Sequence, residues 1–379
     1  MHNRLKFFLA IIISILMIFF CVYAYPSLKE SAQADILGDA IRERAKSSFS
    51  GVITVWQIDS FEGGINSRAT WLQNALTRLE KRYKGVYFAV KSVTVELLPK
   101  LLKTGKPDVI SFGGGVFSLD EAEQYFMPVE APLGVLPALK SSAEGLACPL
   151  FFGGYCMLVA QEFTNKPEYK HGLSDFLGSD FGHVKHNKQS VRVSPLAAGG
   201  YNTSLVPTAL CLGKGGLKCD IVLRQSEGLW DAYNYDRICA AATVTQRQLY
   251  RLKAATDKDK GRKSVVLPLY PYTDMVQYAA VFKGANDAKL RVIYSALEHL
   301  TSTEVQLGLG SIGLMPADLT ALKGIAYDNP YMQSMCDFYK ASPIRVPSAF
   351  ADLNGVNQAA LECIRGNASP EELLSKLYK

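Results

Sequence analysis

The sequence predicts an α/β protein made of two lobes, each a mixed sheet flanked by helices. The chain has 379 residues. Once an N-terminal apolar segment is set aside, about 330–350 residues remain for folded structure, and this length suggests two domains. Strand-like and helical patterns alternate from residue 51 onward, which is typical of a sheet with helices on its faces. A second lobe is expected to begin near Pro149.

The first lobe opens with a β-rich run over residues 52–56. Asn66 or Ser67 can cap the next helix, which ends near residue 83. Its apolar residues recur at helical spacing and form one face: Trp71, Leu72, Ala75, Leu76, Leu79 and Tyr83. The segments that follow predict strand, helix and strand over 86–93, 94–103 and 107–112. The resulting order, β-α-β-α-β, begins a parallel or mixed sheet.

The second lobe is predicted from shorter signals. Residues 151–160 form a strand that would leave the first lobe, and Leu229 to Tyr233 suggest a helix. Further strands are expected over 190–193, 237–245 and 265–268, and a helix opens at Gln246. The remaining helices are expected over 286–300, 302–309, 327–340, 355–365 and 369–378.

The N-terminus predicts a membrane segment. Arg4 and Lys6 precede an apolar run over residues 7–24, and a run of about 18 residues is just long enough to cross a bilayer. Basic residues before such a run stay in the cytoplasm, so the remainder of the chain is expected outside.

We assign residues 1–26 to a membrane anchor or signal segment and residues 27–50 to a polar stalk. The protein would then sit on the extracytoplasmic face of the cell membrane. Cleavage after Ala24 is a second interpretation, which would leave the protein secreted or periplasmic. Lipidation of Cys21 is a third.

Charge and motif content argue against several function classes. The net charge is +6 without a long Lys/Arg run, which gives little support for nucleic-acid binding. No G-x-S-x-G or H-E-x-x-H string occurs, so we expect no enzyme. Gly308-x-Gly310-x-x-Gly313 follows a helix rather than a strand, so we interpret it as chance and expect no cofactor.

The eight cysteines show no CxxC spacing, which argues against a metal site. Cys211 and Cys219 flank a flexible loop and could close a disulfide. For most of the cysteines we favour the role of small buried apolar residues.

Several segments carry a family resemblance through their order and spacing. They are ITVW at 53–56 with Asp59, FEGG at 61–64, SR at 67–68, GKPDVISFG at 105–113, GGY at 153–155, TQRQLYRL at 245–252, YTDMVQY at 272–278, TSTEVQ at 301–306 and IGLMP at 312–316. Together they cover most of residues 51–320. This set resembles the family 1 extracellular solute-binding proteins, the maltose-binding-protein-like sugar receptors of ABC importers.

The resemblance implies a type II periplasmic-binding-protein-like fold with a ligand cleft between two lobes. Carried over, the first lobe holds residues 51–148 and 275–316, and the second holds 149–274 and 317–379. It also implies the substrate-binding component of an ABC importer, which would deliver a small polar solute, expected to be a carbohydrate, to permease transmembrane subunits.

Candidate ligand contacts follow from where such sheets bind ligands, beyond the carboxyl ends of their strands. The loops over 59–64 and 111–115 lie there, and their glycines would let a ligand approach the backbone. A sugar needs aromatic rings for its C–H faces and carboxylates or amides for its hydroxyls. The predicted site is therefore Asp59, Glu62, Gly63, Ser111, Gly113, Tyr155, Trp230, Gln246, Arg247, Tyr270, Tyr272 and Asp274.

Other cargoes stay open at this point. The acids Asp59, Glu62 and Asp274 would also suit a cationic ligand such as a polyamine, and a peptide or an anion would differ only in cleft chemistry. An extracellular hydrolase is a more distant alternative. Asp59→Ala and Asp274→Ala are expected to abolish a ligand-induced rise in melting temperature without changing the stability of the free protein.

Overall fold

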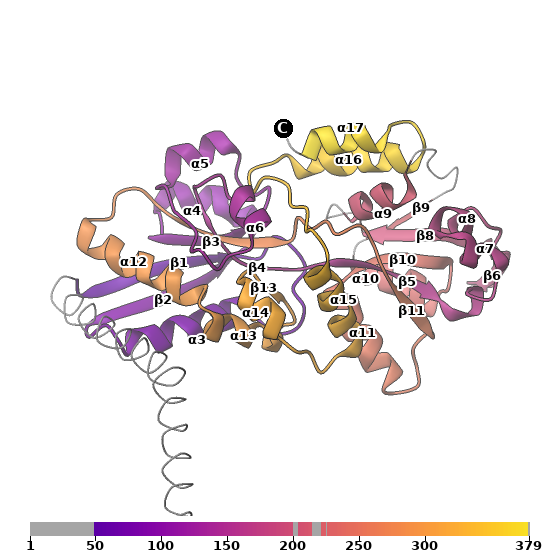
Figure 1. The fold of residues 1–379 in the computed structure, drawn as a ribbon, viewed down its shortest axis with the longest axis horizontal. Helices are drawn as coiled ribbons and strands as arrows, with labels where there is room; N and C mark the ends of the chain where they lie inside the picture. Colours follow the sequence, from indigo (N-terminus) through magenta and orange to yellow (C-terminus); the bar gives the residue numbers. More distant parts are fainter. Residues whose placement is uncertain (1–48, 200–203, 214–220, 225, 378–379) are drawn as a thin grey trace, which may run out of the picture.

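The computed structural model describes residues 49–199, 204–213, 221–224 and 226–377, which form two lobes side by side (Figure 1). The predicted anchor and nearly all of the predicted stalk lie outside these residues. Within the described ranges, no helix combines the length and the apolar character needed to cross a membrane.

The first lobe is built on a six-stranded sheet in the order β13-β4-β12-β3-β1-β2. Its strands are β1 (Gly51–Ile58), β2 (Val86–Val93), β3 (Val109–Gly113), β4 (Cys148–Phe152), β12 (Val276–Val281) and β13 (Met315–Pro316). β1 runs parallel to β2 and β3, whereas β12 is antiparallel to both β3 and β4. The predicted mixed sheet is confirmed, although β12 was not recognised as a strand because its short apolar run has no alternation.

Helices cover both faces of this sheet, with α4, α5 and α6 above it and α3, α13 and α14 below it in Figure 1. Their bounds are α3 (Arg68–Glu80), α4 (Leu98–Thr104), α5 (Leu119–Tyr125), α6 (Pro137–Ser142), α12 (Asp287–Leu300), α13 (Thr303–Leu307) and α14 (Leu319–Gly324), with 3₁₀ turns η2 (Val95–Leu97) and η5 (Gly308–Ile312). Ser67 caps α3 by accepting a hydrogen bond from the Thr70 amide, as predicted.

The second lobe contains a five-stranded sheet in the order β11-β5-β10-β8-β9. Its strands are β5 (Tyr155–Ala160), β8 (Ser194–Gly199), β9 (Ile221–Arg224), β10 (Cys239–Thr245) and β11 (Ser264–Pro268), and a separate hairpin pairs β6 (His183–His186) with β7 (Gln189–Arg192). β10 is parallel to β8 and antiparallel to β5.

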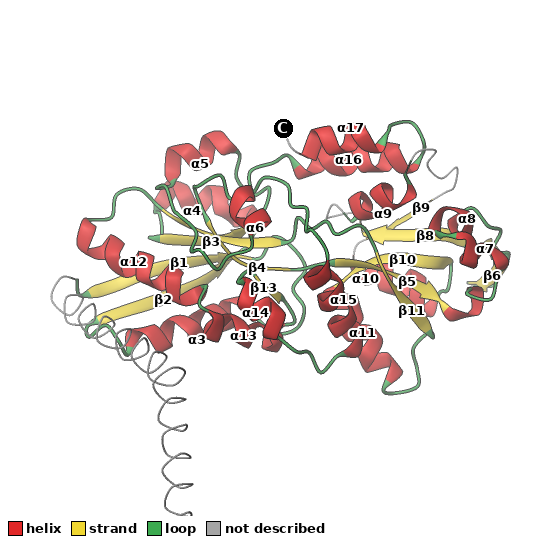
Figure 2. Cartoon of the chain, viewed as in Figure 1, coloured by secondary structure: helices red, strands yellow, loops and turns green. Residues whose placement is uncertain are grey.

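The helices of the second lobe again lie on both faces of its sheet, as the colouring by element in Figure 2 makes clear. They are α7 (Pro167–His171), α8 (Leu173–Leu177), α9 (Leu205–Leu212), α10 (Ser226–Trp230), α11 (Gln246–Thr256), α15 (Pro330–Ala341), α16 (Leu353–Ile364) and α17 (Pro370–Leu377), with short turns η3 (Gln161–Phe163) and η4 (Asp231–Tyr235). Thr245 and Gln248 form a capping box at the start of α11.

The strand predicted over 151–160 is two strands of different sheets. β4 pairs with β12 and β13 in the first lobe, and β5 pairs with β10 and β11 in the second. The break falls at Gly153 and Gly154, between the end of β4 and the start of β5, and close packing favours glycine there because a Cβ on Gly154 would meet Tyr339, Met315 and Met335 at under 3 Å. The predicted lobe boundary at residue 149 therefore moves to these glycines.

A second boundary also shifts. α14, which falls in the segment 317–379 predicted for the second lobe, packs against α13 and β13 of the first lobe. After α15, the segment 342–352 runs back along the first lobe, where the Ala349 carbonyl accepts a hydrogen bond from the Gly115 amide. The chain thus passes between the lobes more than once.

No disulfide joins the described cysteines, and all but Cys211 are buried. The disulfide suggested for Cys211 and Cys219 stays a prediction, because Cys219 lies outside the described residues. Burial raises the pKa of the Cys148 thiol to about 12, so this residue behaves as a small apolar group.

His299 fastens α12 onto α3, since its Nε2 atom lies 3.1 Å from the Ala75 carbonyl. Burial lowers the pKa of this imidazole in the folded protein. The unfolded chain therefore binds a proton at His299 more readily than the folded protein does. The stability that the neutral, buried imidazole contributes should be lost as the pH falls below about 6.5. We expect His299→Gln to flatten the pH dependence of the melting temperature between pH 7 and pH 5. An unchanged slope would contradict this.

Candidate functional site

The strand ends of the two sheets bring two polar edges together. In the first lobe, β1 and β3 are parallel and end at Ile58 and Gly113, and the loop over residues 59–67 follows β1. In the second lobe, β8 and β10 are parallel, and β10 ends at Thr245, where α11 begins. The geometry therefore places the loop after β1 and the start of α11 on facing edges, as expected for a binding region beyond carboxyl ends.

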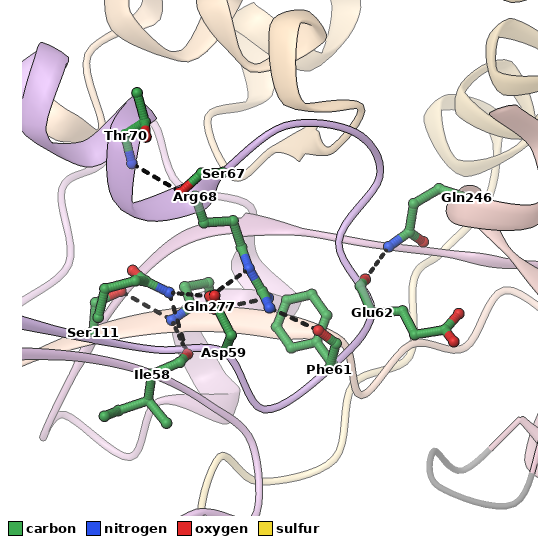
Figure 3. A network of polar contacts seen from close by, with 11 residues as sticks. Ile58, Asp59, Phe61, Glu62, Ser67, Arg68, Thr70, Ser111, Gln246 and Gln277 are labelled. Atoms are coloured by element: carbon green, nitrogen blue, oxygen red, sulfur yellow. Dashed lines mark hydrogen bonds and ion pairs between the residues drawn. The ribbon is translucent and has the colours of Figure 1, made fainter. Parts of the chain in front are cut away.

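The loop after β1 is organised around the buried guanidinium of Arg68, which is 5% exposed. Its Nε atom lies 2.9 Å from Asp59 Oδ1, and its Nη2 atom donates to the Phe61 carbonyl at 2.7 Å. The guanidinium also lies 4.4 Å from the centroid of the Phe61 ring. Figure 3 shows the Arg68 side chain between Asp59 and Phe61.

Amide side chains extend the network across the sheet. Arg68 Nη1 donates to Gln277 Oε1 at 3.3 Å, and Gln277 Nε2 donates to Ser111 Oγ at 3.0 Å and to the Ile58 carbonyl. Gln57 Nε2 donates to Asp59 Oδ1 at 3.1 Å. Burial lowers the pKa of Arg68 and its pairing with Asp59 opposes that shift, so the ion pair stabilises the charged guanidinium.

Glu62 reaches from this loop to the second lobe (Figure 3). The Thr245 hydroxyl donates to Glu62 Oε2 at 2.7 Å, and Gln248 Nε2 donates to the same oxygen at 3.3 Å. Gln246 Nε2 donates to the Glu62 carbonyl at 2.6 Å. The predicted residues Asp59, Glu62 and Gln246 therefore lie in one connected region.

Two polar atoms of this region are buried without a hydrogen-bond partner among the described residues. They are Gln57 Oε1 and Ser60 Oγ. A buried polar atom without a partner costs free energy and is uncommon in folded proteins, so these atoms are places where a bound polar molecule or water could contribute a partner.

The glycines of the loops pack against protein atoms, with one exception. A Cβ on Gly113 would lie 2.1 Å from Ser60 Oγ, and one on Gly115 would meet Leu353 at 3.0 Å. The expectation that Gly113 makes room for a ligand is wrong in this arrangement, because Ser60 and Phe61 fill that space. Gly63 has no atom within 4 Å of its Cβ position, so it keeps an open face.

Tyr155, Tyr272 and Asp274 lie inside the connection between the lobes rather than on a surface. Both tyrosines are fully buried and their rings stack at 6.5 Å. The Tyr155 hydroxyl donates to Asp274 Oδ1 at 2.6 Å. Asp274→Ala would leave that buried hydroxyl without this acceptor, so the expectation of unchanged stability for this variant is corrected to a loss.

The remaining predicted residues occupy different surroundings. Trp230 is buried in the hydrophobic core, where its ring contributes packing. Arg247 pairs at 3.3 Å with Glu227 on the surface. Ser111 is buried in the network of Gln277, and Tyr270 is partly buried against the core of the second lobe. Their assignment to the ligand site stays a prediction.

Sequence reasoning missed Gln57, Arg68 and Gln277, although signals for them were present. Arg68 occupies the same helical stripe as Trp71, Leu72 and Ala75, so a charge at that position is buried and needs a partner. Gln277 is an amide within the fully buried strand β12, and Gln57 is a buried amide next to buried Ile58 at the end of β1. Within the described ranges, no three His, Cys, Asp or Glu side chains gather as a metal site would need.

Solved structures with a similar fold cover most of the chain. A cyclo/maltodextrin-binding protein complexed with maltotetraose matches with a TM-score of 0.57 at 13% identity, covering 87% of this chain and 96% of that one. The GacH receptor of Streptomyces glaucescens matches with a TM-score of 0.54 at 14% identity, over 87% and 97% of the two chains. The MalE domain of Bdellovibrio bacteriovorus bound to maltotriose gives 0.52 at 12%, over 86% and 97%.

The chain has the two-lobed periplasmic-binding-protein fold. The predicted fold class is thus confirmed, with a mixed sheet and flanking helices in each lobe. No protein-family model matches the sequence, and neither does any curated protein sequence. In this fold, the Asp59–Gly64 loop and the start of α11 belong to opposite lobes.

Proposed function

We propose that the chain is the extracytoplasmic substrate-binding component of an ABC importer, which captures a small polar solute by closure of its lobes. The observation that carries this proposal is the fold together with the polar loop of one lobe facing the polar helix start of the other. A ligand held between two lobes makes its full set of contacts only when they close, so binding favours the closed state.

A carbohydrate is the class of cargo that the chemistry favours. Solved structures of this fold include proteins bound to maltotriose, maltotetraose and tagatose. The end of β1 and the loop after it offer the Ser60 hydroxyl and the Gln57 amide oxygen, both without a partner among the described residues, with the Asp59 carboxylate and the ring of Phe61 beside Arg68. Hydroxyl groups can both donate to and accept from such side chains, and an aromatic ring packs against C–H faces.

A cationic cargo has less support from the geometry than from the sequence. The three acids that suggested it already have partners: Asp59 is paired with Arg68, Glu62 accepts from Thr245, and Asp274 accepts from Tyr155. Arg68 therefore compensates the charge of Asp59, and Asp274 is buried, which leaves a polyamine fewer accessible carboxylates than the sequence suggests.

The rest of the proposed function concerns the surroundings of the cleft. An N-terminal segment over residues 1–26 would tether the protein to the membrane, and permease transmembrane subunits would receive the cargo. The binding role implies no catalysis. The ligand would be held by Asp59, Ser60, Phe61 and Gly63, with Gln57 beneath them.

The test is a thermal-shift screen of the full chain against mono- and oligosaccharides, including maltotriose and maltotetraose. At a ligand concentration of about 100 times Kd, a native-state ligand stabilises by about 2.7 kcal/mol, which shifts the melting temperature by several degrees. We expect a shift with at least one sugar and its loss in Asp59→Ala, a variant that also lowers the melting temperature of the ligand-free protein because the buried Arg68 loses its ion pair. Asp120→Ala on the exposed start of α5 is the matched control and should keep the full shift. A response to polyamines and to no sugar would reject a carbohydrate cargo.

A further inference from the structure

The loop over Asp59–Gly64 makes a direct bridge between the lobes. Its Glu62 carboxylate and carbonyl accept hydrogen bonds from Thr245, Gln246 and Gln248 at the start of α11. All of these partners are protein atoms of the second lobe. The bridge is therefore an interaction of the lobes with each other that forms without a cargo.

The bridge starts from a loop that is fixed on both sides of Glu62. Before it, Arg68 holds the Asp59 carboxylate and the Phe61 carbonyl. After it, the Ile65 amide donates to the Ile312 carbonyl at 3.0 Å, and Asn66 Nδ2 donates to the Ser311 carbonyl at 2.7 Å. Because these contacts hold the loop on the first lobe, Glu62 can move away from α11 only when the first lobe moves.

The partners of Glu62 suit a carboxylate. Its Oε2 atom faces the first turn of α11, an 11-residue helix, where unpaired backbone amides favour a negative charge. The Thr245 hydroxyl lies 2.7 Å from Glu62 Oε2 and 2.8 Å from Gln248 Oε1. Its single proton serves one acceptor at a time, and an ionised carboxylate is the stronger of the two.

We propose that the Asp59–Gly64 loop is a latch that favours the closed arrangement of the lobes, with Glu62 as its fastening group and Arg68 as its positioning residue. Opening that moves the Asp59–Gly64 loop away from α11 would break the hydrogen bonds of Glu62, so these bonds favour the closed state by their own free energy. Loss of a charge-assisted hydrogen bond of this kind should lower the closed-to-open ratio by about 10-fold or more.

The test measures the distance between the lobes in the full chain without added ligand. Dyes on unnatural amino acids at Lys100 of the first lobe and Lys185 of the second, both exposed, report this distance by single-molecule energy transfer. We expect Glu62→Ala to increase the long-distance population by about 10-fold relative to the short-distance one. Glu123→Ala, an exposed glutamate of α5, is the matched control and should leave the distribution unchanged.

Double variants separate a latch from a general loosening of the structure. Thr245→Val should open the lobes in the parent chain but add little in the Glu62→Ala background, because the two changes remove one interaction. Arg68→Lys should open the lobes partly, because it keeps the charge but not the planar fork. In the Glu62→Ala background, Arg68→Lys should cause little further opening of the lobes.

Two results would overturn the proposal. If Glu62→Ala leaves the distance distribution of the ligand-free chain unchanged, Glu62 does not fasten the lobes. If Arg68→Lys opens them equally with and without Glu62, Arg68 is not its positioning residue. Neither result depends on a sugar response, so failure of the latch and failure of the proposed function are distinguishable.

Discussion

Phe112→Ala is expected to lower the free energy of unfolding by about 3–5 kcal/mol, since it opens a cavity in a closely packed aromatic cluster. Phe112 is fully buried at the end of β3. Its ring lies 5.1 Å from Phe117 edge-on and 5.8 Å from Phe126, and it also packs with Tyr278 and Phe350. Truncation removes these contacts at once.

Denaturant unfolding checks this expectation, with the midpoint lowered at an unchanged slope. Phe112→Leu is the matched variant, and it should lose clearly less because it retains most of the buried apolar volume. Phe112 lies directly after Ser111, which accepts a hydrogen bond from Gln277 in the network of Arg68, so the alanine variant should also weaken a sugar response that depends on this network. A midpoint within experimental error of the parent would show that the cluster does not contribute to stability.

Arg262→Leu is expected to be the second large loss, at about 3 kcal/mol, because it removes a buried donor from several acceptors at once. The arginine side chain is 2% exposed and pairs with Glu162 at 2.6 Å. Its Nη1 atom donates to the carbonyls of Tyr233 at 2.9 Å and Cys239 at 2.6 Å. The leucine variant leaves both carbonyls without this donor.

Calorimetry of the full chain measures this loss, and hydrogen exchange locates it. The amides of β10 and η4 in the second lobe should exchange faster, while those of β1 and β3 in the first lobe should change least. Arg365→Leu, whose arginine is about half exposed and pairs with Glu362 on α16, is the control and should cost little. Equal destabilisation by the two variants would contradict the role of burial.

The sequence located local elements closely. The helices predicted over 286–300 and 369–378 are observed as α12 over Asp287–Leu300 and α17 over Pro370–Leu377. The strand predicted over 237–245 is β10, Cys239–Thr245. These signals survive because caps, turns and apolar periodicity depend on residues only a few positions apart.

The site was only partly predictable, because its contacts join residues that are far apart in the chain. Asp59 and Glu62 are predicted from the end of a strand and Gln246 from the polar and aromatic residues of the second lobe, and the three lie in one connected region. Tyr155, however, is buried by contacts with Asp274 and Tyr339, which are 119 and 184 positions away in the chain. No local pattern distinguishes such a tyrosine from one that lines a cleft.

The kind of elements, their order and the presence of two α/β units can be predicted from the sequence, because they follow from short-range backbone and burial preferences. Which polar groups meet depends on the three-dimensional packing of the chain. Arg68 pairs with Asp59 and hydrogen-bonds to Gln277, and Glu62 hydrogen-bonds to Thr245. These contacts join residues up to 209 positions apart in the chain. Such pairings depend on how the sheets and lobes pack, and packing is a property of the whole chain.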